Sequence, residues 1–198
     1  MIGAIDIIGV TDAFSASYAA ARVKFLEAAA TASLQIESFN ASALGQKGEV
    51  MALDVASQKS ASSKASDNLL IISSAANQGA DRMAGSGVQV YILHDAEWMD
   101  KVRASGISVL YLHGVEQSLA DVVKKQVAQA KKVTLIDLSA SHSLKAVVFP
   151  ALSDANLAEK CTFSVVKSIP ATEPVWQGQT ISLARQALFK AVDALHKI

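Results

Sequence analysis

A histidine and a glutamate three residues apart, His113 and Glu116, have side chains that could do chemistry together. Positions i and i+3 on a helix point in one direction, so this pair could hold a metal ion. The other histidines, His94, His142 and His196, stand at no recognised ligand spacing from it. The alternative interpretation is a polar histidine at a strand end and a first-turn glutamate that interacts favourably with a helix dipole. Both interpretations stay open at the level of sequence.

A second set, Asp137, Ser139 and His142, has the residue types of a serine hydrolase triad. The three lie within six residues of the chain, whereas a working triad converges from separate elements. Polar residues at the end of a strand explain this set better. The run Gly85-Ser86-Gly87 fits neither the G-x-S-x-G elbow nor the G-x-G-x-x-G nucleotide motif, and its small residues predict close packing of a helix on a sheet.

The elements that must position these residues follow from the periodicity of the apolar residues. Strands are predicted at 34–39, 49–55, 69–72, 107–112, 133–138 and 161–166, and helices at 16–32 (capped by Ser15), 80–93, 96–104, 119–131 and 181–196. The first two strands are expected to pair, and the later β-α-β-α-β order predicts a largely parallel sheet with helices on both faces. We therefore expect a single α/β domain over residues 1–198, built as a three-layer sandwich around a mixed, mostly parallel sheet.

Composition limits the classes of partner. Hydrophobic residues make up 51% and charged residues 18%, which suits a well-buried α/β domain and argues against disorder. The 18 basic and 18 acidic residues form no basic stripe, so we expect no nucleic-acid partner and no anionic membrane. No segment approaches ~18 uninterrupted apolar residues, which predicts no transmembrane helix. The single cysteine, Cys161, cannot form an internal disulfide and fits a reducing cytoplasm.

The stretch from Leu69 to Leu93 resembles a known family. Its short apolar strand, Ser73-Ser74, a polar turn and Ala84-Gly85-Ser86-Gly87 are similar to the strand–turn–helix of the bacterial zinc carboxypeptidase-like family, within the carboxypeptidase A superfamily. The turn carries one extra residue here. Residues 14–26, 52–56 and 132–138 resemble three further stretches of that family in the same order. The resemblance implies a shortened zinc carboxypeptidase-like fold.

The same resemblance places the three zinc-ligand positions of the family on Gln78, Asp81 and Ser139. Zinc sites use Cys, His, Asp or Glu, and only Asp81 qualifies. The family's Asn-Arg pair, which grips a substrate carboxylate, has no counterpart between residues 115 and 119. Its catalytic glutamate should lie near 163–167, where the sequence is Phe-Ser-Val-Val-Lys. Ligands, general base and carboxylate clamp are thus all replaced.

These replacements predict a non-catalytic protein, without a cofactor, whose degenerate cleft binds a small polar ligand or a protein partner. Gln78, Asp81 and Ser139 are expected to lie together at the carboxyl edge of the sheet, because they follow the ends of two strands. The alternative is a hydrolase (a peptidase or amidase) with a site rebuilt around His113, Glu116 and His142. The residues assigned to the degenerate cleft are Gln78, Asp81, Arg82, Ser139 and His142.

Overall fold

The computed structural model describes residues 11–15, 17–44, 50–58, 68–74, 84–114, 119–138, 144–165 and 174–196. Its strands are β1 (Gln35–Leu44), β2 (Val50–Gln58), β3 (Asn68–Ser74), β4 (Ser108–Gly114), β5 (Lys132–Asp137) and β6 (Cys161–Val165). Its α-helices are α2 (Tyr18–Thr31), α3 (Ala84–Leu93), α4 (Ala96–Ser105), α5 (Leu119–Gln129), α6 (Leu144–Asp154) and α7 (Pro174–His196), with short 3-10 turns at Thr11–Ala13 and Ala158–Lys160.

The strands form one sheet in the order β1-β2-β4-β3-β5-β6. The pairs β1–β2 and β2–β4 are antiparallel, and β4–β3, β3–β5 and β5–β6 are parallel. An antiparallel hairpin therefore extends one edge of a parallel sheet. This arrangement confirms the predicted mixed, mostly parallel sheet.

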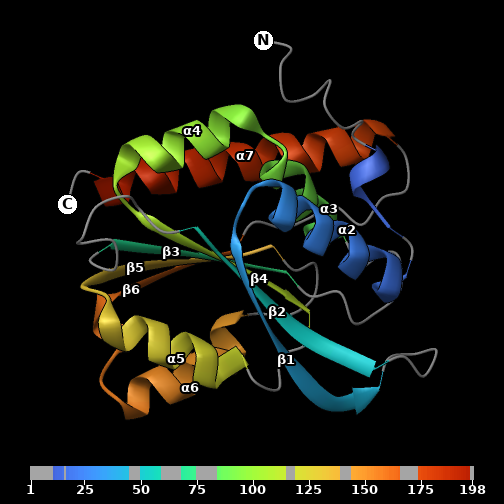
Figure 1. Cartoon of the computed structure of the whole chain (residues 1–198). Helices are drawn as coiled ribbons and strands as arrows, with labels where there is room; N and C mark the ends of the chain where they lie inside the picture. The colour runs from blue at the N-terminus through green and yellow to red at the C-terminus, as the bar shows by residue number, and fades with distance from the viewer. Residues whose placement is uncertain are drawn as a thin grey trace.

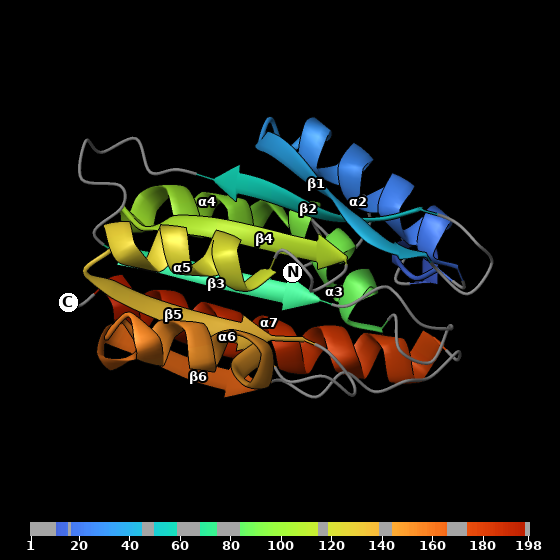
Figure 2. The ribbon, with the colours of Figure 1, turned by 90° about the horizontal axis from the view of Figure 1, so that it is seen from below.

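Helices cover both faces of the sheet, so the molecule has three layers (Figure 1). Helices α2, α3, α4 and α7 lie on one face, and α5 and α6 lie on the other, where Figure 2 shows them in front of the strands. Side chains alternate between two cores: Leu70 and Ile72 of β3 point to the first face, and Leu69 and Ile71 to the second. A strand buried on both faces is mostly apolar, which is why Leu69 to Ile72 of β3 form an unbroken apolar run.

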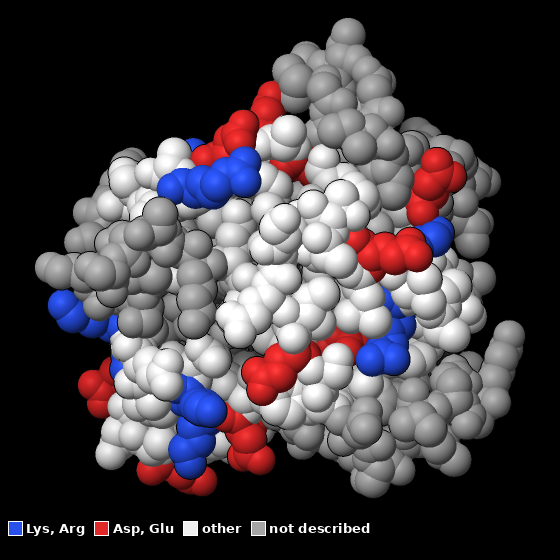
Figure 3. All heavy atoms as spheres, viewed as in Figure 1, with Lys and Arg blue, Asp and Glu red and all other residues white. Residues whose placement is uncertain are grey.

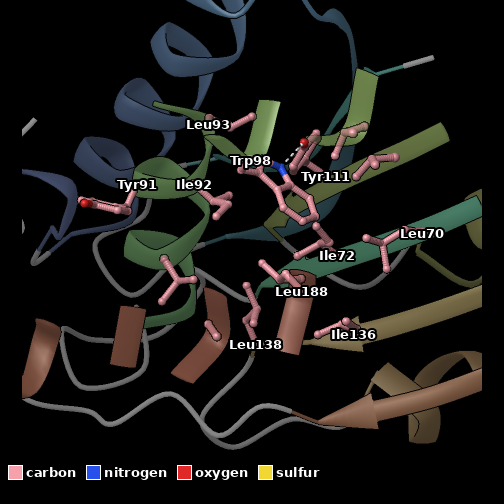
Figure 4. Packing of buried hydrophobic residues seen from close by; sticks show 14 of the residues in the cluster. Leu70, Ile72, Tyr91, Ile92, Leu93, Trp98, Tyr111, Ile136, Leu138 and Leu188 are labelled. Carbon is pink, nitrogen blue, oxygen red and sulfur yellow. Dashed lines mark hydrogen bonds between the residues drawn. The ribbon is translucent and has the colours of Figure 1, made fainter. Parts of the chain in front are cut away.

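The core of the first face is centred on Trp98 of α4, which is fully buried. Its indole Nε1 donates a hydrogen bond of 2.8 Å to the hydroxyl of Tyr111 on β4 (Figure 4). The Tyr111 hydroxyl in turn donates to Gln58 Oε1 at 2.7 Å. Leu188 of α7 and Ile136 of β5 belong to the same core. These hydrogen bonds pair the polar atoms of two large aromatic side chains, so burying both side chains leaves no polar atom of theirs without a partner.

A buried carboxylate joins α4 to α7. Asp95 caps α4 by accepting from the Trp98 backbone N–H, and its other oxygen lies 2.5 Å from Nε of Arg185 on α7. Arg185 also pairs with Glu97 at 2.5 Å and lies over the ring of Phe189. Because Asp95 is almost fully buried, the arginine supplies the charge that its burial requires.

Two boundaries on the first face differ from the prediction. The first helix begins at Tyr18 with Ser17 as its cap, not Ser15: Ser17 has an extended backbone, and its Oγ accepts from the Ala20 N–H at 3.3 Å. The last helix begins at Pro174, not at residue 181. Proline suits the first position of a helix, because a backbone N–H has no partner within the helix there. Gly178 breaks the apolar pattern in the first turns of this helix, and for this reason the pattern predicted a later start.

Helix α6 was not predicted. Pro150 lies inside it, and a proline in a short segment argues against a helix at the level of sequence. Val148 and Leu152, one helical turn apart, are both fully buried in the second core. Tertiary packing of this apolar pair therefore outweighs the local cost of the proline.

Substitution of Gly114, the last residue of β4, tests how closely β2 approaches the end of β4. It has φ +118°, and a Cβ there would overlap the carbonyl oxygen of Ala52 on β2. We expect Gly114→Ala to lower the free energy of unfolding by about 3 kcal/mol or more, because backbone strain and a backbone clash add. Urea unfolding followed by circular dichroism measures this.

Gly106 provides the matched control, because it also has positive φ (75°) but no atom within 4 Å of the place that a Cβ would occupy. Gly106→Ala should cost only about 1 kcal/mol, from the left-handed backbone alone. Equal losses for the two variants would contradict the close approach of β2 to β4.

Candidate functional site

The path of the chain makes the carboxyl end of β3 a candidate position for a ligand. After β3 the chain passes to α3 on the first face, whereas after β4 and β5 it passes to α5 and α6 on the second. Strand β3 lies between β4 and β5 in the sheet. Open α/β sheets bind ligands outside the carboxyl ends of their strands where the connections diverge in this way. The end of β3 is therefore the candidate site, called the β3 crevice below.

Leu138, directly after β5, contacts both the end of β3 and the start of α3. Its N–H donates a 2.8 Å hydrogen bond to the carbonyl of Ser73 at the end of β3. A Cβ on Gly85, in the first turn of α3, would overlap the Leu138 carbonyl oxygen, so only glycine allows α3 to start this close. The ends of β3 and β5 and the start of α3 thus meet at one point.

The five residues assigned to the degenerate cleft belong to the two segments that leave this junction. Residues 75–83 connect β3 to α3, and residues 139–143 follow Leu138. Gln78, Asp81, Arg82, Ser139 and His142 all lie outside the described residues. The clustering of Gln78, Asp81 and Ser139 therefore stays a prediction, and the described ends of β3 and β5 lie where that prediction needs them.

Polar side chains lie buried beneath the crevice, between α3 and the sheet. We call Ser74, Ser86, Gln89 and His113 the α3 polar cluster. The Ser86 Oγ lies 2.7 Å from His113 Nε2, and Gln89 Nε2 donates to Ser74 Oγ at 2.9 Å and to the Leu112 carbonyl at 2.7 Å. Two buried atoms, Gln89 Oε1 and His113 Nδ1, have no hydrogen-bond partner among the described residues.

His113 is the described member of the predicted metal pair, and its surroundings suit a neutral core histidine. The imidazole stacks on Phe25 of α2 with ring centres 4.7 Å apart and is fully buried. Burial lowers its pKa to about 4; the nearby Asp54 carboxylate raises it, and Arg22 lowers it further. Its Nε2 is taken by Ser86, and Glu116 lies outside the described residues.

Asp54 of β2 stands directly opposite His113 in the sheet register. Its carboxylate is fully buried and receives two hydrogen bonds from Arg22 of α2, from Nε at 2.7 Å and Nη2 at 3.1 Å. Ser38 of β1 donates a third from its hydroxyl at 2.6 Å. The arginine therefore neutralises Asp54, and the hydrogen bonds given to its oxygens come from α2 and β1.

Asp54, His113 and Ser86 bring triad residue types together from three separate elements, which sequence analysis missed. A base with a pKa near 4 is weak at neutral pH, and Ser86, 1% exposed, is closed to substrate. The arrangement accordingly fits a structural network rather than a serine hydrolase site. One sequence pattern indicates this buried network: Ser86 and Gln89 stand three residues apart, on one side of a helix that follows a buried strand.

A zinc ion does not fit the donors that the sequence offers at the crevice. Gln78 and Ser139 supply neutral oxygens, and Asp81 alone supplies a carboxylate, whereas catalytic zinc takes three protein ligands from His, Cys, Asp and Glu. Across the described parts of the chain, no group of three or more His, Cys, Asp or Glu side chains could hold a metal ion.

The three-layer fold is shared with glutaminyl cyclases of known structure. A glutaminyl cyclase from Macrostomum lignano matches with a TM-score of 0.57 at 8% identity, over 96% of this chain and 88% of that one. One from Fimbriiglobus ruber gives 0.55 at 9% identity, over 96% and 94%. A Zn-dependent exopeptidase from Parabacteroides distasonis gives 0.40 at 10% identity, over 85% and 73%, too weak a likeness to carry an inference. Identities this low show a common fold and nothing of activity.

The chain belongs to the family described as a protein of unknown function, DUF2817, whose sequence profile matches residues 14–117. No curated protein sequence matches it significantly. The matched residues run from just before α2 to just past β4. They include Asp54, its partner Arg22 and the whole α3 polar cluster, so the buried network lies in the part of the chain that defines the family.

The charged side chains on the outer surface are mixed in sign. On the face in Figure 3, lysine and arginine lie among aspartate and glutamate, and no broad area of one sign appears among the residues drawn in colour. Within the described residues, no helix is long and apolar enough to cross a membrane.

The lowered pKa of His113 predicts a pH dependence of stability. In the unfolded chain the imidazole takes up a proton near its ordinary pKa of 6.5, whereas the folded protein resists protonation down to about pH 4. The unfolded state binds more protons between these values, so the free energy of unfolding falls as pH drops from 6.5 toward 4. We expect His113 to contribute up to about 3 kcal/mol to this fall.

The double variant Ser86→Ala, His113→Phe isolates this contribution, because it removes both hydrogen-bonding partners together and keeps a ring on Phe25. Its free energy of unfolding, measured by urea titration across the same pH window, should depend less steeply on pH than that of the unsubstituted protein. Parallel pH curves would show that His113 does not titrate as described.

Proposed function

We propose that this chain is a non-catalytic relative of the carboxypeptidase A superfamily that binds a small polar ligand, or a segment of a protein partner, in the β3 crevice. The observation that carries the proposal is the junction of Leu138 with Ser73 and Gly85. It brings together the ends of β3 and β5 and the start of α3, at the edge of the sheet where this class of fold binds ligands, and the segments bearing the cleft residues continue from these ends. The cleft residues in this proposal are Gln78, Asp81, Arg82, Ser139 and His142.

The types of these residues support a polar ligand. An amide, a carboxylate, a guanidinium, a hydroxyl and an imidazole offer both donors and acceptors, and Asp81 and Arg82 carry opposite charges. Such a set suits a zwitterion or a peptide end better than an apolar compound or a polyanion. The compared glutaminyl cyclases are named for glutaminyl substrates, which makes small glutaminyl peptides reasonable probes of the same crevice.

The alternative function, a hydrolase rebuilt around His113, Glu116 and His142, has less support. His113 is buried against Phe25 and bonded to Ser86, so its Nε2 is not free to bind a metal or a substrate. Burial also lowers its pKa to about 4, which leaves it a weak base at neutral pH. Glu116 and His142 remain candidates from sequence only.

Ligand binding is tested by titrating amino acids and an N-terminal glutaminyl dipeptide while recording backbone amide NMR signals. We expect at least one compound to shift the amides of Ser74, Gly85 and Leu138, which flank the crevice. Asp81→Ala should weaken that binding by about fivefold or more through the loss of a charged partner. The matched control is Lys125→Ala, on the solvent-exposed side of α5. Conversion of the dipeptide by metal-free protein would contradict a non-catalytic function.

The same donor set predicts that the purified protein holds no stoichiometric zinc. One carboxylate with two neutral oxygens should lose zinc at ordinary free-metal levels. Elemental analysis after dialysis provides the measurement. About one zinc per chain, lost in Gln78→Ala, would overturn both the predicted absence and the degenerate-site interpretation.

Restoring the three ligand types should restore metal binding but not activity. The triple variant Gln78→His, Asp81→Glu, Ser139→His offers two imidazoles and a carboxylate, a common catalytic zinc set. The melting temperature should rise with added zinc in this variant and not in the unsubstituted protein. Peptidase activity should stay absent, since the carboxylate clamp and general base are still missing. A melting temperature unmoved by zinc would mean that the three positions do not converge.

A further inference from the structure

A second pocket lies away from the β3 crevice, on the first face beside α7. Its volume is about 450 Å³, within the range of roughly 300–1,000 Å³ that small-molecule sites occupy. It lies over β5 and the edge strand β6, along the carboxyl-terminal half of α7. The residues that line it are Lys132, Thr134, Ile136, Thr162, Ser164, Ala187, Lys190, Ala191, Ala194 and Leu195.

The floor of this pocket is the part of the sheet that α7 leaves open. Thr134 of β5 stands opposite Thr162 of β6, and Ile136 stands opposite Ser164. Because side chains alternate along a strand, these four share the first face. Thr162 and Ser164 are exposed there, since α7 packs on β3 and β5. Three hydroxyl groups therefore line an accessible floor.

The wall and rim of the pocket differ in character. Ala187, Ala191 and Ala194 form one stripe of α7, and their small side chains leave the space that larger residues would fill. Lys132 and Lys190 also line the pocket, and none of its lining residues in the described part of the chain is acidic. Neither lysine has an ion-pair partner among the described residues. The pocket is thus locally basic in a chain with no net charge.

We propose that this pocket binds a small organic carboxylate that carries a short apolar chain. Lys132 and Lys190 supply the positive charge, and the hydroxyls of the floor donate to the carboxylate oxygens. The alanine stripe and Leu195 contact the apolar chain. A free phosphate suits the pocket less, because the alanine side chains of α7 make its wall apolar.

Hexanoate is a suitable probe, and isothermal titration calorimetry on the full chain measures its binding. We expect saturable binding that Lys190→Gln weakens by about tenfold, a loss typical of one charged partner. Ala191→Phe should abolish binding by filling the groove, without lowering the melting temperature, because Ala191 borders open space. Lys125→Gln, on the opposite face, is the matched control and should leave the affinity unchanged. Hexanol, which lacks the charge, should bind at least about tenfold more weakly.

Several outcomes would overturn this proposal. Absence of saturable hexanoate binding up to ~10 mM would show that the pocket is not a carboxylate site. Equal affinity in Ala191→Phe would place the ligand elsewhere, and tighter binding of inorganic phosphate than of hexanoate would reject the ligand class. Asp81→Ala, which alters the β3 crevice, should leave hexanoate binding intact. This result separates the pocket from the proposed function at the crevice.

Discussion

The buried carboxylate of Asp54 is the interaction on which the first face of the molecule depends. An isolated charge in this position would be very costly, so Arg22 must lie over it, and this requirement fixes the placement of α2 on the sheet. Helix α2 then brings Phe25 onto His113, and Ser38 of β1 completes the set of donors to Asp54. One charge therefore links α2 and three strands. The hydroxyl of Tyr18, bonded to both the N–H and the carbonyl of Ala52, adds a second tie at the same place.

This arrangement explains how residue types that can be reactive are buried in a structural network at the carboxyl edge of the sheet. His113 and Ser86 meet at hydrogen-bonding distance, yet the aromatic rings of α2 exclude water, and exclusion of water keeps the imidazole neutral. A network of this kind rigidifies the base of the crevice. A rigid base helps a binding site, because less freedom is lost when the ligand arrives. A ligand bound at the end of β3, as proposed above, would therefore rest on a rigid network.

Among the described residues, periodicity in the sequence predicted all six strands and five of the six α-helices. Strands buried on both faces, such as β3, are predicted from their short apolar runs. It failed where tertiary packing decides: α6 tolerates Pro150 because Val148 and Leu152 are buried. The candidate site was predicted less completely. Short motifs pointed to the ends of β3 and β5, but the pairing of Asp54 with His113 depends on strand register, which no local pattern contains. Cys161 fits no reactive role either, since partial burial raises its pKa to about 11.

The order of the strands also has a consequence for biosynthesis. The family-matched residues 14–117 contain β1 to β4, which form four neighbouring strands of the six-stranded sheet. In that part of the sheet, β3 is an open edge, and the Trp98 side of the core lacks Ile181, Ala184, Leu188 and Val192 of α7. A nascent chain that has emerged only to β4 therefore exposes an apolar strand edge and half a core, the features that promote misassociation. Protection by chaperones should matter most in the interval before α7 leaves the ribosome.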